Sequence, residues 1–414
     1  MKKRIIDNSW SFNGVDTKEF SHRYHIYPAM MIPQIARRLI NDFKPESTNF
    51  IFDPYCGTGT TMLEAKLANI DSAGTDLNPM ARLISKVKIT NYNLNEILKY
   101  KDLISNETFR FSFNINNTNL KLIDFPNIKF WFSKKSIIEL SFLLNNILEN
   151  IEKNYQDFFM VALSETLREV SYTRNSEFKL YRMPKHKMEL HNPDTFGIFF
   201  NKLNRNIDGL KELNETGRNT NVKIYDFNTC YESPKEILKR EIDFVVTSPP
   251  YGDSRTTVAY GQFSRLSNQW LGIENASQID NILMGGNRKD DLLKFHSEYA
   301  QNELAQIKSI DSKRFIEVEN FLNDYKLSIN NVAKSIRKNG RIAYVVGNRT
   351  VKGVQIPLDY ITVELFEQNN FEHITTIVRE IPNKRMPKEN SPTNEKGKKS
   401  STMNNEYIVI MEKK

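Results

Sequence analysis

The tetrapeptide Ser248-Pro249-Pro250-Tyr251 combines residue types suited to chemistry on an aromatic amine. It follows the apolar run Ile242–Thr247, and the strand must end here because proline cannot donate to a sheet ladder. An amine conjugated with a ring is a poor nucleophile, since its lone pair is delocalised into the ring. Two acceptors aimed at its hydrogens, the Ser248 hydroxyl and the Pro249 carbonyl, would free that lone pair. Tyr251 would then stack on a base taken out of its duplex.

A second corner of the sequence has the residues of a cofactor site. The stretch NFIFDPYCGTGTTMLEA, residues 49–65, reads as a strand, a glycine turn and a helix. Gly57 and Gly59 let the backbone turn tightly and approach a ligand, and the start of the helix offers free N–H groups. Asp76 ends the next predicted strand, where a carboxylate can bind the hydroxyls of a ribose.

The chemistry of this second corner disfavours a dinucleotide. The third glycine of a dinucleotide fingerprint is absent, and Met62 occupies that region. Asp53 stands just before the turn, where its charge would repel a pyrophosphate. A cofactor with an ammonium group and no phosphate fits better, and S-adenosylmethionine is the obvious one. The alternative is an ordinary turn of an α/β sheet with exposed acids.

Seven short apolar runs, bounded by turn residues, predict the strands that position these corners. They are Asn49–Tyr55, Ile70–Asp76, Val222–Phe227, Ile242–Thr247, Arg341–Val346, Thr375–Ile381 and Glu406–Met411. Helical patterns lie between them at Thr60–Ala68, Pro79–Val87, Phe315–Lys338 and Leu358–Asn369. Near-continuous apolarity indicates strands buried on both faces. We therefore expect a Rossmann-like, doubly wound, seven-stranded α/β sheet, with the last two strands paired antiparallel at one edge.

One interval breaks the alternation of strands and helices. Residues 91–220 are mainly helical in pattern, and we interpret them as an inserted subdomain. The insert divides the main domain into an N-terminal part, residues 1–90, and the remainder, residues 221–414. The stretch Lys388–Thr402 (KENSPTNEKGKKSST) reads as a mobile loop.

The composition favours a polyanionic partner and a reducing compartment. The 414 residues carry a formal net charge of +8, which makes nucleic acid the first partner to consider. Only Cys56 and Cys230 are present, which argues against a disulfide framework and fits the cytoplasm. The cysteines and histidines have no ligand-like spacing, so we expect no metal site. No apolar run is long enough to span a membrane.

The segment Ser171–Lys187 is the best candidate for a DNA contact. It holds five basic residues against one acid, interleaved with aromatic rings that suit phosphate binding and stacking. A solvated surface of the insert is the alternative. The residues proposed to contact DNA are Tyr172, Arg174, Lys179 and Arg182, with Arg255 and Tyr260 just past the Ser-Pro-Pro-Tyr corner. Phe263 and Trp270 read as core residues, and Met284–Asp291 reads as a lid or a DNA-contacting loop.

Three segments resemble the DNA amino-methyltransferases, which transfer methyl groups to exocyclic amines of DNA bases. They are HIYPAMMIP (residues 25–33), DPYCGTGT (53–60) and TSPPYG (247–252), and the closing NEYIVIMEK resembles the family's last strand. The resemblance implies S-adenosylmethionine as cofactor and double-stranded DNA as substrate. It carries cofactor-binding roles over to Tyr27, Pro28, Ala29, Met30, Asp53, Pro54, Cys56, Gly57, Thr58, Gly59, Thr60, Asp76, Leu77, Asn78, Asp226 and Phe227.

The resemblance also implies where these residues act. The segment Tyr27–Met30 is expected at the methionine end of the cofactor, and Asp226 beside its adenine ring. The helical insert occupies the place where some members carry a target-recognition region. We therefore expect the insert to read DNA.

The head of the tetrapeptide bears on the target base. Serine resembles the members that methylate cytosine at N4, whereas Asp or Asn is more typical of members directed to adenine N6, the first alternative. Methylation of a ring carbon needs a cysteine that follows a proline, and neither Cys56 nor Cys230 does so. An N2-guanine tRNA methyltransferase and a catalytically silent DNA-binding subunit are less favoured candidates. The resemblance suggests a restriction–modification setting, with a cognate restriction endonuclease as a further partner.

Overall fold

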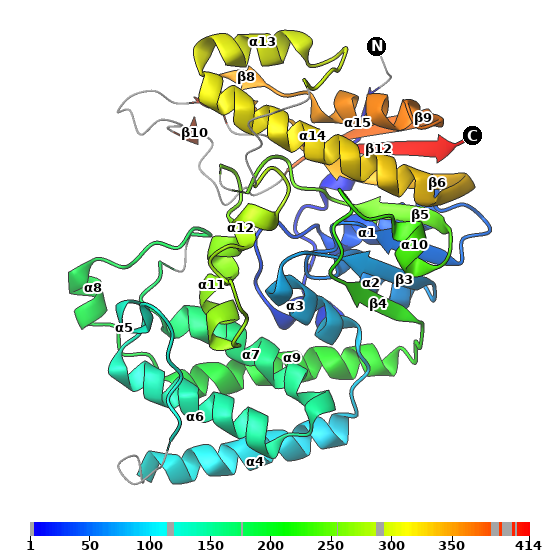
Figure 1. The fold of residues 1–414 in the computed structure, drawn as a ribbon. Helices are drawn as coiled ribbons and strands as arrows, with labels where there is room; N and C mark the ends of the chain where they lie inside the picture. Colours follow the sequence, from blue (N-terminus) through cyan, green and yellow to red (C-terminus); the bar gives the residue numbers. More distant parts are fainter. Residues whose placement is uncertain are drawn as a thin grey trace.

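The computed structural model describes residues 4–113, 120–174, 177–254, 256–286, 294–381, 389–390, 400–401 and 404–414. Its centre is an eight-stranded sheet with helices on both faces, and a helical subdomain lies at one side of the sheet (Figure 1). The strand order is β1-β9-β12-β6-β5-β2-β3-β4. These strands are Arg4–Ile6 (β1), Phe50–Asp53 (β2), Asp71–Thr75 (β3), Val222–Tyr225 (β4), Ile242–Thr247 (β5), Ile336–Val346 (β6), Phe371–Glu380 (β9) and Asn405–Lys413 (β12).

The pairing of the strands agrees with a doubly wound sheet. Neighbouring strands are parallel, except that β12 is antiparallel to both β6 and β9. The predicted antiparallel pairing of the last two strands is therefore confirmed. The edge beyond them is formed by β1, which makes the sheet eight-stranded instead of seven-stranded. With three residues, β1 is too short to give a periodic signal in the sequence.

The helices fall into two groups. Those around the sheet are Pro33–Phe43 (α1), Thr60–Leu67 (α2), Pro79–Ile89 (α3), Pro234–Leu238 (α10), Tyr260–Trp270 (α11), Ile279–Ile282 (α12), Gln301–Ile310 (α13), Ser312–Ser335 (α14) and Leu358–Glu367 (α15). Those of the insert are Leu94–Phe113 (α4), Ile128–Trp131 (α5), Lys134–Asn150 (α6), Lys153–Val170 (α7), Lys185–Glu189 (α8) and Thr195–Glu215 (α9). Asn8–Ser11 (η1) and Phe20–Tyr24 (η2) are short 3₁₀ helices, and the pairs Thr350–Val351 (β7) with Val354–Gln355 (β8) and Glu389–Asn390 (β10) with Ser400–Ser401 (β11) form two small ladders. Apart from this last ladder, the stretch Lys388–Thr402 lies outside the described residues.

Both faces of the central strands are buried. In β5, Val245 packs into a core that includes residues of α14 and α15, whereas Phe244 and Val246 pack on the opposite face with residues of α1. Successive side chains of a strand point to opposite faces, so a sheet covered twice needs apolar residues at nearly every position. This explains the continuous apolar runs in the sequence.

The insert shares its hydrophobic core with elements outside it. Its helices pack around Met80 and Ile84 of α3 and around Leu266 of α11. Phe263 and Trp270 belong to the same core and are 7% and 1% exposed, so their prediction as core residues is confirmed. Helix α11 thus joins the insert to the main domain, and it lies between the two in Figure 1.

Candidate functional site

A cleft opens at the carboxyl edge of the sheet, where the parallel strands β2, β3, β4 and β5 end. Its volume is about 1060 Å³ when the open solvent at its mouth is counted. The sequence predicted many of its lining residues: Tyr27, Pro28, Ala29, Met30, Asp53, Pro54, Cys56, Gly57, Thr58, Thr60, Asp76, Leu77, Asn78, Phe227, Ser248, Pro250 and Tyr260.

The two glycines of the turn after β2 have different tasks. Gly57 and Gly59 both have positive φ, 48° and 78°. A Cβ on Gly57 would meet no atom within 4 Å, whereas a Cβ on Gly59 would lie 2.3 Å from Oγ of Ser85 on α3. Gly57 therefore keeps space open in the cleft, and Gly59, which is outside the lining, lets α2 pack against α3.

Asp53 is a buried carboxylate at the end of β2, with 3% of its surface exposed. Its Oδ1 accepts hydrogen bonds from Oγ1 of Thr247 at 2.5 Å and from the backbone nitrogen of Tyr55 at 3.0 Å. Burial raises the pKa of Asp53 to about 6, although these hydrogen bonds act in the opposite direction. A cationic ligand would favour the ionised form of such a group.

Asp76 follows β3 and fixes the glycine turn. Its Oδ2 accepts from the backbone nitrogen of Gly57 at 3.0 Å, and its Oδ1 accepts from the backbone nitrogen of Asn78 at 2.8 Å. Asn78 in turn donates from Nδ2 to Oη of Tyr27 at 2.8 Å. Burial raises the pKa of Asp76 as well. The ends of β2 and β3 and the upstream segment are thus held together by hydrogen bonds.

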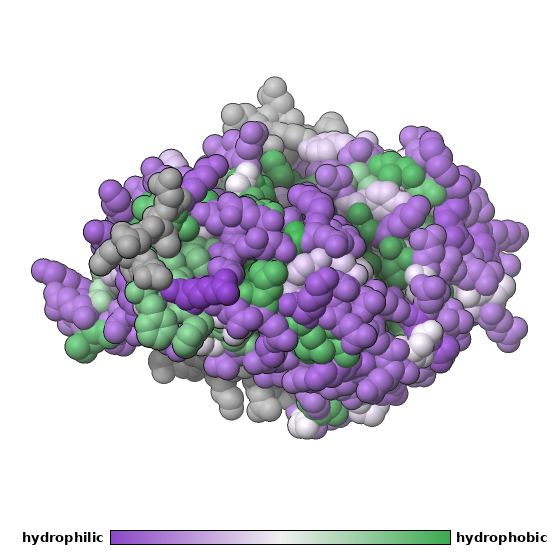
Figure 2. All heavy atoms as spheres, turned by 90° about the horizontal axis from the view of Figure 1, so that it is seen from below, coloured by the Kyte–Doolittle hydropathy of each residue, from purple (hydrophilic) through white to green (hydrophobic). Residues whose placement is uncertain are grey.

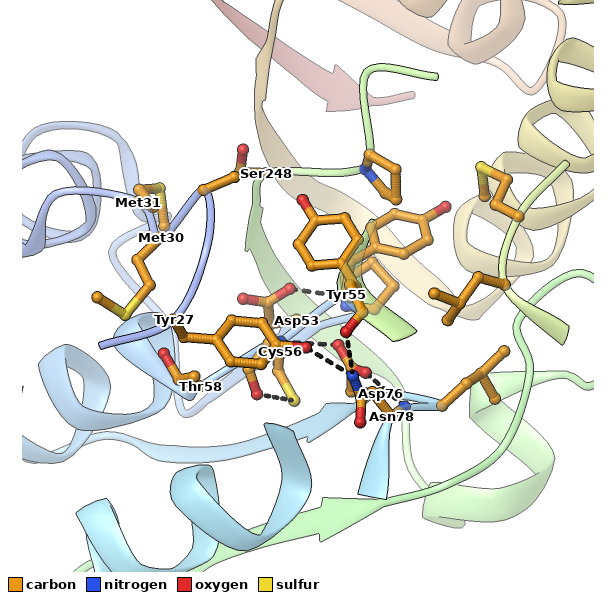
Figure 3. A pocket seen from close by; sticks show the side chains of 18 of the residues that line it. Tyr27, Met30, Met31, Asp53, Tyr55, Cys56, Thr58, Asp76, Asn78 and Ser248 are labelled. Atoms are coloured by element: carbon orange, nitrogen blue, oxygen red, sulfur yellow. Dashed lines mark hydrogen bonds between the residues drawn. The ribbon is translucent and has the colours of Figure 1, made fainter. Parts of the chain in front are cut away.

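The segment Tyr27–Met31 forms one wall of the cleft. The Tyr27 ring stacks on that of Tyr260, the first residue of α11, with centroids 6.0 Å apart. Ala29 has a positive φ of 51°, and Met30 is 40% exposed. In Figure 3 both methionines of the segment lie on the same side of the cleft as Ser248.

The Ser-Pro-Pro-Tyr corner lies at the end of β5. Ser248 and Pro250 line the cleft, while Pro249 is buried behind them. The Oγ of Ser248 is 3.1 Å from Oη of Tyr251, which donates to Oε1 of Glu406 on β12 at 3.0 Å. In Figure 3 the Ser248 hydroxyl points away from the carboxylates at the ends of β2 and β3.

Two predicted residues, Asp226 and Arg255, are not found among the residues that line the cleft. The Asp226 side chain is 77% exposed, lies outside the cleft lining, and has its Oδ2 3.8 Å from Nη2 of Arg82. It follows β4 directly, and the alternation of side chains along the chain turns Phe227 into the cleft instead. The place expected for Asp226 beside the adenine ring of the cofactor stays a prediction. Arg255 lies outside the described residues.

Several lining residues were missed in the sequence: Met31, Tyr55, Thr61, Asn228, Thr229, Cys230, Ser254, Leu283 and Met284. Those at 228–230 follow β4, so the rule that ligands bind at the carboxyl ends of strands could have found them. Met284 begins the segment predicted to be a lid or a DNA-contacting loop, of which the structure describes only Met284–Gly286. The sequence does not identify Glu406 as a residue of the site, because its approach to Tyr251 depends on the order of the strands in the sheet.

The predicted DNA-binding residues of the insert lie on one narrow hairpin between α7 and α8. The backbone nitrogen of Arg174 donates to the carbonyl of Tyr181 at 2.9 Å, and that of Met183 donates to the carbonyl of Tyr172 at 2.7 Å. The guanidinium of Arg182 lies 4.0 Å from the centroid of the exposed ring of Phe130 on α5. We call residues 171–174 and 177–184 the basic hairpin.

The basic hairpin is held against the cleft wall. The backbone nitrogen of Leu180 donates to Oε1 of Gln262 on α11 at 3.4 Å, and the ring of Phe178 lies 6.2 Å from that of Phe263. Helix α11 begins at Tyr260, which lines the cleft. Exposed aromatic and basic side chains therefore stand close to the candidate active site.

Neither a metal-binding cluster nor a membrane-spanning helix occurs in the part of the chain that the structure describes. Within it, no group of three or more His, Cys, Asp or Glu residues is arranged to hold a metal ion. Within the same residues, no helix is long and apolar enough to cross a membrane.

The residues of the cleft fit the expected cofactor. Asp53 offers a carboxylate for an ammonium group, and Asp76 offers one for ribose hydroxyls. Phe227 and Leu77 add apolar surface for a purine ring, and Gly57 leaves room beside them. S-adenosylmethionine carries all three groups, together with the activated methyl on its sulfonium.

Comparison with known proteins agrees with this chemistry. A family model described as DNA methylase, of the N6/N4 type, matches residues 1–87. The type II methyltransferase M.MvaI of Kocuria varians is 39% identical and covers 99% of this chain and 95% of its own length. M.BsoBI of Geobacillus stearothermophilus, also a type II methyltransferase, is 21% identical over 89% of this chain and 83% of its own.

Among solved structures, a TehB-like SAM-dependent methyltransferase from Corynebacterium glutamicum covers 92% of this chain and 87% of its own, at 10% identity and a TM-score of 0.31. That likeness is too low to support a conclusion. The match to M.MvaI extends over nearly both whole chains. The chain therefore belongs to the DNA amino-methyltransferases, the type II DNA methyltransferases that use S-adenosylmethionine as methyl donor.

Proposed function

We propose that this enzyme methylates the exocyclic N4 amine of cytosine, on a base taken out of a specific site in double-stranded DNA. The observation that carries the choice of base is the serine at the head of the Ser248–Tyr251 corner. This corner stands at the rim of the cleft that holds Asp53 and Asp76, so an amine held there would face the methyl donor. Adenine N6 is the alternative outcome.

The proposed chemistry needs positioning and electrostatics only. The Ser248 hydroxyl and the Pro249 carbonyl accept hydrogen bonds from the target amine and free its lone pair for attack on the methyl group. The rings of Tyr251 and Tyr260 hold the base. Asp53 binds the ammonium group of the cofactor, and Asp76 binds its ribose.

The proposed DNA contact is the basic hairpin, with Tyr172, Arg174, Lys179 and Arg182. Its support is the position against α11, which begins at the cleft wall. We propose that it binds phosphates next to the extruded base. The names of the relatives also support a restriction–modification role, with a cognate restriction endonuclease as partner.

The direct test of the function identifies the methylated nucleoside. PCR-amplified bacterial genomic DNA, which is free of methylation, is incubated with the enzyme and isotope-labelled S-adenosylmethionine, then digested and analysed by mass spectrometry. We expect labelled N4-methylcytosine. Labelled N6-methyladenine would contradict the choice of base, and a parallel reaction with tRNA that takes up label while the DNA does not would contradict the substrate.

The proposed role of Ser248 gives a separate prediction. Ser248→Ala should reduce the methylation rate by about 10- to 100-fold, because one acceptor for the amine is removed. The Kd for S-adenosylmethionine should stay unchanged, since Asp53 and Asp76 remain. Single-turnover methylation and calorimetry measure the two quantities. A wild-type rate would remove Ser248 from the mechanism.

A further inference from the structure

We propose that Glu406 positions the Ser248 hydroxyl through Tyr251, so that the serine presents only acceptor lone pairs to the target amine. The proposal rests on the proposed function of Ser248. It adds a residue from β12, two places away from β5 in the sheet and 155 residues beyond Tyr251 along the chain. Glu406 acts through Tyr251 and is therefore a positioning residue.

Three side chains form a line of hydrogen bonds that ends at Ser248. Oη of Tyr251 lies 3.1 Å from Oγ of Ser248 and 3.0 Å from Oε1 of Glu406. The other carboxylate oxygen of Glu406, Oε2, pairs with Nη1 of Arg379 on β9. The side chains of Arg379 and Glu406 are only 2% and 18% exposed, so water competes weakly for these contacts.

The direction of each hydrogen bond follows from what each group can donate. Tyr251 donates to Oε1 of Glu406, since a carboxylate oxygen accepts hydrogen bonds. The single proton of Tyr251 is then committed, and its oxygen can only accept from Ser248. Ser248 therefore directs its one proton to Tyr251 and leaves its lone pairs for other partners. Burial and the nearby Glu406 raise the pKa of Tyr251 well above its ordinary value, which keeps the phenol protonated.

This fixed direction matters for an amine, which approaches with its hydrogens. A serine hydroxyl that rotates freely spends part of its time with its own proton toward the incoming group. A hydroxyl whose proton is held by Tyr251 is an acceptor before the base arrives, so no reorganisation is needed at the moment of reaction. In Figure 3 the Ser248 hydroxyl points away from the cofactor-binding carboxylates.

Glu406→Gln reverses the donor and acceptor directions of these hydrogen bonds, with little change in the shape of the side chain. Arg379 carries donors only, so the amide oxygen of the new side chain turns toward Arg379 and the NH₂ group turns toward Tyr251. Tyr251 then accepts from the amide and donates to Ser248. The Ser248 proton is released toward the target amine, where it repels the amine hydrogens.

The test is the single-turnover methylation rate on PCR-amplified bacterial genomic DNA, with saturating labelled S-adenosylmethionine. Glu406→Gln should lower this rate by about 10- to 100-fold, while the Kd values for S-adenosylmethionine and for DNA stay unchanged. Tyr251→Phe should also lower the rate. Adding Glu406→Gln to Tyr251→Phe should have no further effect, because the connection is already broken.

Glu412→Gln is the matched control. Glu412 lies on the same strand and pairs with an arginine, Nε of Arg341 to Oε2 at 2.6 Å, at the end of β12 away from Tyr251. This variant removes an ion pair between strands, more exposed than that of Glu406 at 31% and 35%, without touching the hydrogen bonds to Ser248. It should methylate at the wild-type rate.

The outcomes separate this proposal from the function on which it rests. A wild-type rate in Glu406→Gln, together with a slow Ser248→Ala, would overturn the role of Glu406 and leave that of Ser248 intact. A wild-type rate in Ser248→Ala would contradict the proposed role of Ser248. Equal losses in Glu406→Gln and Glu412→Gln, or additive losses with Tyr251→Phe, would overturn the proposal in favour of a general effect on the sheet.

Discussion

Burial of Asp53 brings its protonation into the range near neutral pH. Its pKa of about 6 arises because the folded protein removes the carboxylate from water. The unfolded chain releases this proton near pH 3.8, so Asp53 lowers the stability of the folded state as the pH rises from there to about 6. The affinity for the cofactor depends on pH in the opposite direction and rises as Asp53 ionises. The reason is that an ammonium group binds the ionised carboxylate and offsets part of the cost of burying it.

We therefore predict that the affinity for S-adenosylmethionine depends on pH through Asp53. Below pH 6 the carboxylate is increasingly protonated, so affinity at pH 5 should be about tenfold lower than at pH 7. Calorimetric titrations between pH 5 and pH 8 measure the profile. Asp53→Asn should bind weakly with a flatter profile over the same range. A flat wild-type profile would mean that Asp53 does not bind the ammonium group.

At the scale of elements, the basic hairpin makes a prediction about DNA affinity. Charge reversal at Arg174 and Lys179 should weaken binding and reduce the slope of log K against log salt by about 0.9 for each phosphate that the hairpin no longer neutralises. Fluorescence anisotropy with duplex DNA at several salt concentrations measures both quantities. If the hairpin binds phosphates and not base edges, as we propose, the affinity should fall by a similar factor for all sequences.

Helix α4 offers a matched control for this experiment. Lys99 and Arg110 are exposed, and each pairs with a glutamate three residues away, as Arg174 does. Figure 1 shows α4 at the bottom of the molecule, far from β3 and β5. Reversing these two charges changes the net charge equally and should leave the salt slope at its wild-type value. If the two double substitutions changed the DNA affinity and the salt slope equally, the overall charge of the protein, and not the hairpin, would determine binding.

The parts of the site that the sequence predicts are those fixed by local pattern. Asp53, Asp76 and Ser248 each end or follow an apolar run, and parallel strands bring such ends to one edge. The contact between Glu406 and Tyr251 depends on β12 entering the sheet beside β6, which no local pattern encodes. Strand β1 escaped prediction because a three-residue edge strand has no periodicity.

At the scale of the whole molecule, the insert is part of the main domain's packing. The rings of Phe125 and Phe132 lie 6.0 and 5.4 Å from that of Trp270 on α11. Its ends are close together, since Nδ2 of Asn91 donates to the carbonyl of Arg218 at 2.9 Å. Seen from below, the surface of the molecule is largely hydrophilic, with apolar side chains in small groups (Figure 2). The insert thus covers apolar surface of α3 and α11, while several of its own large apolar side chains stay exposed, among them Phe109, Phe113 and Leu190.

Excision of residues 91–220 therefore tests whether the insert is a separate folding unit. The neighbouring ends would accept a short glycine–serine linker, but the apolar faces of α3 and α11 would be uncovered. Each large apolar side chain that is no longer buried costs about 1.5–3 kcal/mol, and a few of them equal the total stability of about 5–15 kcal/mol of a typical domain. We predict that the shortened chain loses cooperative thermal unfolding, measured by circular dichroism, and aggregates in size-exclusion chromatography.

The intact chain should unfold in one transition, and Trp270→Ala should lower its midpoint. Two independent transitions, or a shortened chain that still binds S-adenosylmethionine, would show instead that the two parts fold separately.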